Sequence, residues 1–558
     1  AGSTKEPGIW HAGGGGMIYR VYTKDWYFNA GILGFLYVLS DGEKNIDNII
    51  NKCGQKLQIN PNYLEFDTEL LDDFYEKYRK LAFINFFDLG SYKGRVIHLI
   101  SKLNEIKEDQ KVTKKILSEV ALNGKVVNKF FECLNGTSLE DIFNSFQYQN
   151  EIKNKIQNLN NILNGFSSSE KLYIYLNNSL NKSEFISYFL NLEVNKRICN
   201  YENIQNYLYD ICNSKSLEEK NNNKICFLCN KYTKKYELNN AITQVIGFNK
   251  DNSNWIWGFY DSKVKICPLC ALIYTCAVHG MAFIKKSIKG EYKTYFYFLN
   301  RNADLKTMYQ SLMLYIEEMR KKENENKPYY TLLREITIKL IKTKAESFIG
   351  NIHFIEIKEN EFGGQGTKSY NIYNFNITPE LAEFVYKISS EEIPKGKYIN
   401  KDVYIDVTEE IIKKTLDQSL SYSDLNCYFD IYIRQSVFYS LYKIRNYILK
   451  YINHYKGGNS MNYETIVKKG FGNGIEISQK IDSQNKLKGI AYQLLNDLKI
   501  GDKNAFMDKY LRLSMSYDVS IRLGSNNELT DTDSFMQFGY SFINGLLSKQ
   551  ESKEGKNG

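Results

Sequence analysis

The sequence contains few histidines and none of the common catalytic motifs. Only five histidines occur in 558 residues, and one of them lies in the first sixteen. The other four are His98, His279, His353 and His454, and none adjoins an aspartate, which argues against a histidine-rich nuclease site. The sequence also lacks a nucleophile elbow, a kinase signature and a dinucleotide-binding fingerprint. A phosphate loop requires glycine directly before its lysine, but Thr367 precedes Lys368. We therefore predict that the protein is not an enzyme.

Long apolar runs are absent as well. No run reaches the roughly 18 residues that a membrane-spanning helix needs. The apolar stretch 30–39 is short, it follows Asp25, and no small-residue cleavage site comes after it. We expect it to be a buried helix and not a signal peptide. Since only ten cysteines occur and four of them form a metal-binding pattern, a reducing compartment is favoured. We expect a cytoplasmic protein with no membrane partner.

Composition allows several domains and a nucleic-acid partner. Residues 1–16 end in four glycines before Met17, which is typical of an expression tag and linker. The rest of the chain is long enough for two or three domains, and an apolar content of 43% supports packed cores. The net charge of +9 is mildly basic. This charge is compatible with nucleic-acid binding but does not require it.

The pattern of residues predicts an α+β protein. Residues 17–403 alternate short strands with amphipathic helices, and we expect a zinc module at about 222–282 to be inserted in this N-terminal domain. Residues 404–558 read as a helical bundle. One apolar stripe of a single long helix consists of Ile433, Val437, Leu441, Ile444, Ile448 and Ile452. Two further stripes begin at Leu487 and Phe535. Gly501 is the expected cap after the second stripe, and Thr532 and Asp533 are the expected caps before the third.

Two cysteine pairs are the clearest chemical signal. They are Cys226-Phe-Leu-Cys229 and Cys267-Pro-Leu-Cys270. A two-residue gap lets both thiolates of a pair reach one tetrahedral ion. The alternative is two redox or buried pairs, but a redox pair usually starts a helix in a βαβ unit, whereas residues 224–225 and 265–266 read as strand ends. We predict structural Zn²⁺ bound by all four cysteines. Cys276 and His279 are alternative ligands.

These motifs together resemble a known family. Residues 25–32 read DWYFNAGI, residues 255–260 read WIWGFY, and 265–270 read KICPLC. With the two cysteine pairs and the helical tail, they resemble the CRISPR-associated CXXC–CXXC family, the large subunit of type I-B Cascade. The resemblance covers essentially everything after Met17. The cysteine pattern is its most specific part, and the helical tail is its most generic part.

The resemblance implies a non-catalytic subunit of an RNA-guided DNA surveillance complex. Such a subunit holds the 5′ handle of the guide RNA, recognises the protospacer-adjacent motif (PAM) on target double-stranded DNA and aids strand separation. It works with other Cascade backbone subunits and a small subunit, and it recruits a helicase–nuclease. Base pairing reads the remaining sequence, so groove and phosphate contacts suffice for the protein.

Two groups of residues are candidates for nucleic-acid contacts. Gly364, Gln365 and Lys368 form a glycine-rich loop that can approach a DNA groove, although an ordinary surface loop is the simpler interpretation. Trp26, Tyr27 and Asn29 can contact RNA by stacking and hydrogen bonding, and the alternative is a role in the core.

Two rival functions remain open at this stage. One is a metal-dependent nucleic-acid-modifying enzyme with a structural zinc module, which requires clustered carboxylates or histidines after folding. The other is a zinc-ribbon scaffold that binds only protein, which predicts no salt-dependent affinity for nucleic acid.

The segment 461–558 has a further possible role as a separately translated small subunit, since the family can produce that subunit by internal translation. The codons for residues 456–458 can contain a purine-rich ribosome-binding site, and Met461 follows at a suitable distance. The alternative is a flexible turn before an ordinary methionine.

Overall fold

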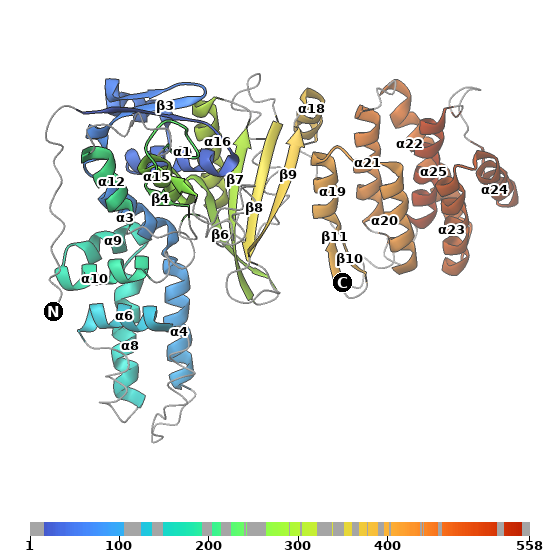
Figure 1. Cartoon of the computed structure of the whole chain (residues 1–558). Helices are drawn as coiled ribbons and strands as arrows, with labels where there is room; N and C mark the ends of the chain where they lie inside the picture. The colour runs from blue at the N-terminus through green and yellow to red at the C-terminus, as the bar shows by residue number, and fades with distance from the viewer. Residues whose placement is uncertain are drawn as a thin grey trace. The chain divides into compact units, whose positions relative to one another are not determined.

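The chain is divided into two compact units in a computed structural model. The structure describes residues 16–104, 124–136, 149–191, 203–213, 225–238, 242, 264–288, 291–301, 304–320, 338, 351–359, 368–376, 378–388, 396–400, 403–435, 438, 440–455, 460–521, 529 and 531–548. Unit 1 comprises Ala1–Glu325 and His353–Tyr373, and unit 2 comprises Asn326–Ile352 and Asn374–Gly558. The described residues are mostly helical and include small antiparallel sheets (Figure 1), which is broadly compatible with the predicted α+β class.

A three-stranded antiparallel sheet opens unit 1. Its strands are β1 (Ile18–Tyr22), β2 (Leu57–Ile59) and β3 (Tyr63–Asp67), in the order β1-β3-β2. The side chains of β1 alternate between exposed and buried, as expected for a strand with one face on a core. Tyr19 and Val21 lie on the buried face, so this sheet covers one side of the core of unit 1.

Helix α1 (Trp26–Leu39) is the central element of unit 1. Every residue after Trp26 in it is buried, which confirms the buried helix predicted over 30–39. The Asp25 carboxylate caps its N-terminus by accepting hydrogen bonds from the backbone N–H groups of Tyr27 and Phe28. Helix α15 (Pro268–Cys276) and the 3₁₀ turn η6 (Ala277–Gly280) pack directly on α1.

Glycines permit this close approach. A Cβ atom at Gly31 would lie 2.3 Å from the Ile273 carbonyl oxygen, and one at Gly34 would lie 1.9 Å from that of Cys276. Both distances are shorter than any van der Waals contact, so only glycine lets these backbones meet.

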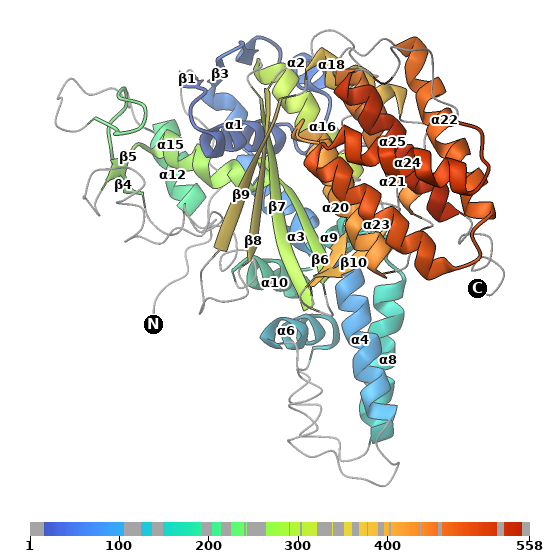
Figure 2. The same ribbon diagram turned by 90° about the vertical axis from the view of Figure 1, so that its right-hand side faces the viewer.

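The other elements of unit 1 surround this centre. A four-stranded sheet has the order β6-β7-β8-β9, and α16 packs on β6 and β7. Helices α4 and α8 lie side by side as a long pair (Figures 1 and 2). The bounds are α2 (Ile46–Cys53), η1 (Gly54–Lys56), η2 (Thr68–Leu71), α3 (Phe74–Phe86), α4 (Leu89–Asn104), α6 (Gly124–Asn135), α8 (Gln149–Asn164), α9 (Ser169–Asn177), α10 (Leu180–Phe189), α12 (Asn203–Asn213), β4 (Tyr236–Glu237), β5 (Lys265–Ile266), β6 (Ala282–Ile288), β7 (Glu291–Arg301), α16 (Leu305–Arg320), β8 (Asn351–Glu359) and β9 (Lys368–Asn376).

Unit 2 consists of a short β-hairpin and a set of packed helices. In chain order they are α18 (Pro379–Lys387), β10 (Lys397–Asn400), β11 (Val403–Asp406), α19 (Val407–Leu416), α20 (Tyr422–Gln435), α21 (Leu441–Tyr455), α22 (Ser460–Gln479), α23 (Gln484–Ile500), α24 (Lys503–Ser516) and α25 (Thr532–Leu547). The predicted bundle began at residue 404. Unit 2 begins earlier, because α18 packs on α21, with Phe384 against Tyr447 and Tyr451.

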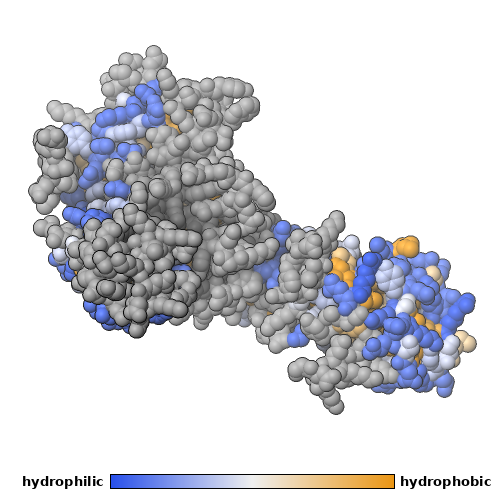
Figure 3. Space-filling model, turned by 90° about the horizontal axis from the view of Figure 1, so that it is seen from below, coloured by the Kyte–Doolittle hydropathy of each residue, from blue (hydrophilic) through white to orange (hydrophobic). Residues whose placement is uncertain are grey.

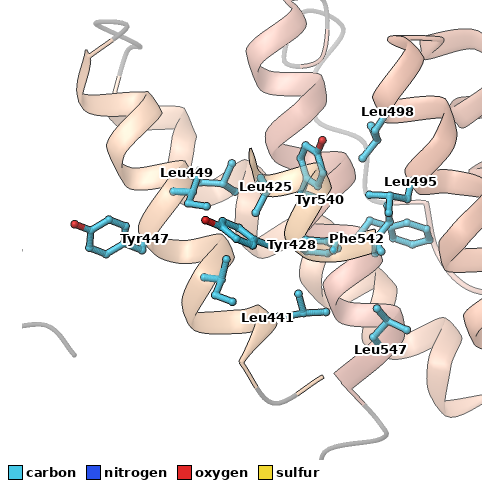
Figure 4. Packing of buried hydrophobic residues seen from close by; sticks show 14 of the residues in the cluster. Leu425, Tyr428, Leu441, Tyr447, Leu449, Leu495, Leu498, Tyr540, Phe542 and Leu547 are labelled. Atoms are coloured by element: carbon cyan, nitrogen blue, oxygen red, sulfur yellow. The ribbon is translucent and has the colours of Figure 1, made fainter. Parts of the chain in front are cut away.

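The core of unit 2 is aromatic and leucine-rich. Figure 4 shows side chains from several helices meeting there, including Leu425, Leu441 and Phe542. Helices α22 and α25 approach most closely: a Cβ atom at Gly474 would lie 2.2 Å from the Phe542 carbonyl oxygen. In the view of Figure 3 the coloured surface is mainly hydrophilic, with small separate apolar patches.

Two sequence predictions for these helices need correction. The stripe from Ile433 to Ile452 does not belong to one long helix: Ile433 lies in α20, the next four described members lie in α21, and Val437 is outside the described residues. The apolar spacing continues from α20 into α21, because the apolar stripes of both helices face the same core. The N-cap of α25 is Asp531, which accepts from the Ser534 N–H at 2.8 Å, and not Thr532 or Asp533. Gly501 is a left-handed cap with φ 77°, as predicted.

Candidate metal centre

The first cysteine pair lies in a tight backbone turn. Ile225 and Thr233 form an antiparallel bridge that closes this turn. Within it, the Cys226 N–H donates to the Tyr232 carbonyl at 2.7 Å, and the Asn230 N–H donates to the Cys226 carbonyl at 2.9 Å. Asn230 takes a positive φ of 52°, a conformation that asparagine tolerates better than most residues. The turn therefore directs Cys226 and Cys229 to one side.

The second pair begins a helix. Strand β5 leads into Cys267, which is the N-cap of α15, and Pro268 occupies the first turn. The Cys267 sulfur accepts a hydrogen bond from the Cys270 N–H at 3.3 Å. A backbone hydrogen bond from the Phe227 N–H to the Lys265 carbonyl joins the two pairs. The fixed φ of proline favours this helix start, so the spacing of the pair places both sulfurs at the helix N-terminus.

All four sulfurs converge on one point. The Sγ atoms of Cys226, Cys229, Cys267 and Cys270 lie within 4.8 Å of one another, and those of Cys229 and Cys267 are 3.8 Å apart. A tetrahedral zinc site with Zn–S bonds of about 2.3 Å has sulfur–sulfur distances of about 3.8 Å. The four cysteines can therefore hold one metal ion, and a set of four protein ligands leaves no open position for catalysis.

The alternative ligands lie elsewhere. Within the described ranges, the four cysteines are the only group of three or more potential ligands that converges on one point. His279 is buried and packs edge-on against Tyr78, with ring centroids 4.5 Å apart. Its Nδ1 lies 3.4 Å from the Asn85 side-chain nitrogen. Cys276 and His279 are thus not part of the metal group.

The electrostatics of the cluster favour a bound cation. Hydrogen bonds from Cys229 and the other two cysteines lower the pKa of Cys226. Burial raises the pKa of Cys267 well above its usual value, and the hydrogen bond to Cys226 is the main cause that raises the pKa of Cys270. The pKa of Cys229 is lowered as well, to about 7, so Cys226 and Cys229 ionise more readily than Cys267 and Cys270. A divalent cation supplies the charge that lets all four ionise.

The residues around the start of α1 contact the first cysteine turn and helix α15. The Lys24 ammonium group donates to the carbonyl of Leu228, which lies between Cys226 and Cys229. The Tyr274 hydroxyl of α15 donates to the Asp25 carboxylate at 3.1 Å, and the Tyr27 and Tyr274 rings stack with centroids 5.3 Å apart. Burial and the nearby Asp25 raise the pKa of Tyr274, so this hydroxyl stays a hydrogen-bond donor.

The candidate RNA contacts in this segment serve mainly the core. Tyr27 is buried, and its hydroxyl donates to the Ile242 carbonyl at 2.6 Å. Asn29 is buried, and its side chain bonds the N–H and carbonyl of Lys24 at 2.8 and 3.2 Å. Trp26 is half-buried beside Phe298, at 6.2 Å between centroids. Burial argues against direct RNA contact by Tyr27 and Asn29, because their polar atoms already have partners inside the protein.

The candidate PAM loop is only partly described. Gly364 and Gln365 lie outside the described residues, and Lys368 is the first residue of β9.

A carboxylate that the sequence analysis missed joins the start of strand β4 to α12. Asp210 accepts from the Lys235 ammonium group at 2.6 Å and from the Tyr236 hydroxyl. Burial and this carboxylate raise the pKa of Tyr236. No spacing rule relates a helix residue to a strand 25 residues later, so only the folded chain shows this pairing.

Comparison of the chain with family models, curated proteins and solved structures gives no match. Among the helices that the structure describes, none combines the length and apolar character required to span a bilayer.

Proposed function

We propose that this chain is the non-catalytic large subunit of a cytoplasmic RNA-guided DNA surveillance complex of the type I-B Cascade kind, and that its four cysteines hold a structural Zn²⁺. The resemblance of residues 25–32 and of both cysteine pairs to that family carries the assignment. The observation that supports it is that these motifs lie against one another in the folded chain. Lys24 contacts the first cysteine turn, and Asp25 and Tyr27 contact Tyr274 of helix α15, whose N-cap is Cys267.

Zinc fits the ligand set better than other common metals. Soft thiolates select zinc, copper(I) and iron–sulfur clusters, whereas calcium and magnesium prefer oxygen ligands. Two CxxC turns with sulfurs at tetrahedral spacing are typical of structural zinc sites. In this position the ion would fix the start of α15 and hold the cysteine turn beside α1.

In the proposed complex the chain binds the 5′ handle of the guide RNA and recognises the PAM on duplex DNA. It contacts the backbone subunits and the small subunit, and it recruits the helicase–nuclease. Trp26 remains the candidate RNA contact of its segment because it is the half-exposed member. Gly364, Gln365 and Lys368 remain the candidate PAM-reading residues.

The PAM assignment is tested in the assembled complex. Replacing Gln365 and Lys368 together by alanine should weaken binding to matched target DNA and leave guide-RNA assembly intact. Each base-edge contact contributes roughly 1–3 kcal/mol of discrimination, so the loss is measurable by titration. Lys401→Ala provides a control for general charge loss. Unchanged binding by the double variant would exclude this loop as the reader.

We also propose that residues 461–558 are made separately as the small subunit. These residues contain helices α22 to α25, which pack extensively on one another: α25 contacts both α22 and α23, and α24 contacts α23. The separated segment would expose the face that α20 covers, where Phe429 packs on Tyr540 at 5.5 Å. That face would then be available to other subunits.

Expression of the native gene tests this proposal. A product of about 11 kDa, scaled from 65.1 kDa for 558 residues, should accompany the full-length protein. Silent recoding of residues 456–458 should remove this band and spare the full-length chain. A band that survives both recoding and replacement of Met461 would place the start elsewhere, and no band would exclude it.

A further inference from the structure

A groove in unit 2 lies between helices α23 and α24. The two helices follow one another in the chain on either side of Gly501 and pack against each other. Residues Lys486, Ile490 and Leu494 line one wall at successive helical turns, and Lys509, Leu513 and Tyr517 line the other in the same way. The groove encloses about 300 Å³. This volume is at the small end of the range for ligand pockets, so it suits one small group and not a folded segment.

The charged residues at the groove are all cationic. Lys486, Lys509 and Arg512 line it, and none of the described lining residues is acidic. Lys509 neutralises Asp497, with nitrogen–oxygen distances of 2.7 and 2.8 Å. Arg512 contacts Asp508 through Nε at 3.0 Å.

These two ion pairs do not use all the N–H donors of the cationic side chains that line the groove. The Arg512 contact with Asp508 uses Nε, so the two terminal nitrogens of its guanidinium group remain for an anion. Lys486 forms no ion pair within the described part of the chain; its ammonium group lies 5.5 Å from the centre of the Tyr517 ring. The groove therefore has an edge of cationic donors, and the carboxylates of Asp497 and Asp508, which pair with Lys509 and Arg512, do not themselves line it.

The other surfaces of the groove suit a flat ring. Ile490, Leu494 and Leu513 provide an apolar floor, and Tyr517 provides an aromatic side. The Lys480 ammonium group holds this side in place by donating to the carbonyls of Tyr517 and Asp518 at 2.6 and 2.7 Å. A ring against Tyr517 would place an attached phosphate within reach of Lys486 and Arg512.

We infer that this groove binds a nucleotide unit, with the base against Tyr517 and the apolar floor and the phosphate at Lys486 and Arg512. Stacking on an aromatic ring does not depend on which base is present, and cations at the rim bind the phosphate. The site lies within unit 2 and does not depend on guide-RNA assembly, so it can be tested apart from the proposed function. The nucleotide can be free or can belong to a single strand.

Calorimetric titration of the full-length chain tests the inference with two probes. Adenosine monophosphate represents a free nucleotide, and a short oligothymidylate represents a single strand. Lys486→Gln and Arg512→Gln should each weaken binding by about tenfold, since a charge-assisted hydrogen bond contributes at least that factor. Lys499→Gln is the matched control, because this exposed lysine lies on α23 but does not line the groove.

The outcomes separate clearly. Binding of the monophosphate that is weakened by the groove variants and not by the control supports a site for free nucleotides. Binding of the oligonucleotide alone, with the same pattern, supports the site and assigns its source to a strand. If neither probe binds at millimolar concentration, or the groove variants behave like the control, the inference is wrong. Thermal unfolding of each variant checks that unit 2 remains folded.

Discussion

Loss of the metal should unfold unit 1 as a whole and not only the cysteine turns. The N-cap of helix α15 is the candidate ligand Cys267, and all nine residues of the helix are buried. It packs on α1 so closely that the glycine positions leave no room for a side chain. A Cβ atom at Gly34 would come within 1.9 Å of the Cys276 carbonyl oxygen. If α15 is displaced, the central helix of unit 1 loses its neighbour. We therefore expect Cys226→Ser to destabilise the whole unit.

The free energy of metal binding is large enough to support a large loss of stability. Zinc binding contributes roughly 10–16 kcal/mol to the folding of structural zinc peptides, whereas whole domains are stable by about 5–15 kcal/mol. If removal of one of the four thiolates weakens metal binding by even part of that amount, the lost free energy is comparable with the entire stability of the unit.

Tryptophan fluorescence is a selective assay for this effect. All four tryptophans of the chain, Trp10, Trp26, Trp255 and Trp257, belong to unit 1. Trp26, which packs beside Phe298, therefore reports the unfolding of unit 1, while far-ultraviolet circular dichroism also reports the helices of unit 2. In Cys226→Ser, the fluorescence transition should move to a lower temperature, and the helical signal of unit 2 should persist.

The control is Cys427→Ser, because this exposed cysteine lies in unit 2 and is not one of the four clustered cysteines. It should leave both transitions and the metal content unchanged. The reasoning fails if Cys226→Ser unfolds at the wild-type temperature. It also fails if well-folded wild-type protein contains less than about half an equivalent of zinc, since one ion per four-cysteine site is required.

Three further predictions concern single contacts and activity. Gly34→Ala should lower the free energy of unfolding of unit 1 by about 1–3 kcal/mol through overpacking, as measured by chemical unfolding. The helical control Gly94→Ala, whose Cβ meets nothing within 4 Å, should be neutral or slightly stabilising. Equal effects of the two substitutions would refute the packing argument. Tyr27→Phe should cost about 0.5–1.5 kcal/mol through the lost hydrogen bond to Ile242 without changing RNA affinity; a loss of RNA affinity with unchanged stability would restore Tyr27 as a direct contact. The purified chain should not cleave labelled DNA with Mg²⁺ or Mn²⁺; cutting that disappears on replacing a carboxylate cluster would favour the enzymatic alternative.

Sequence patterns gave the local features of this fold reliably. The CxxC spacing predicted the convergence of the four sulfurs, because a two-residue gap confines both thiolates to one turn. Uniform apolar character predicted the burial of residues 30–39, and Gly501 signalled the end of α23. The geometry within each cysteine pair and the two helix features depend on residues within one or two turns of each other, whereas the meeting of the two pairs joins Cys229 to Cys267 across 38 positions.

Features that depend on distant residues were not predictable in the same way. Lys24 bonds the Leu228 carbonyl across 204 positions, and no local pattern encodes that contact. The break between α20 and α21 was hidden because the apolar stripes of both helices face one core. The groove that includes Lys486 and Tyr517 arises only when α23 and α24 pack together. Burial likewise decides that Tyr27 and Asn29 face inward.

The most direct test of the proposed function is target binding by a reconstituted complex with and without this chain. The complex is assembled from the backbone subunits, the small subunit and a guide RNA, and it is mixed with matched duplexes whose flanking bases are randomised. Sequencing of the bound fraction should show a defined flanking motif only when this chain is present. Equal binding without the chain, or no selection among flanks with it, would contradict the assignment.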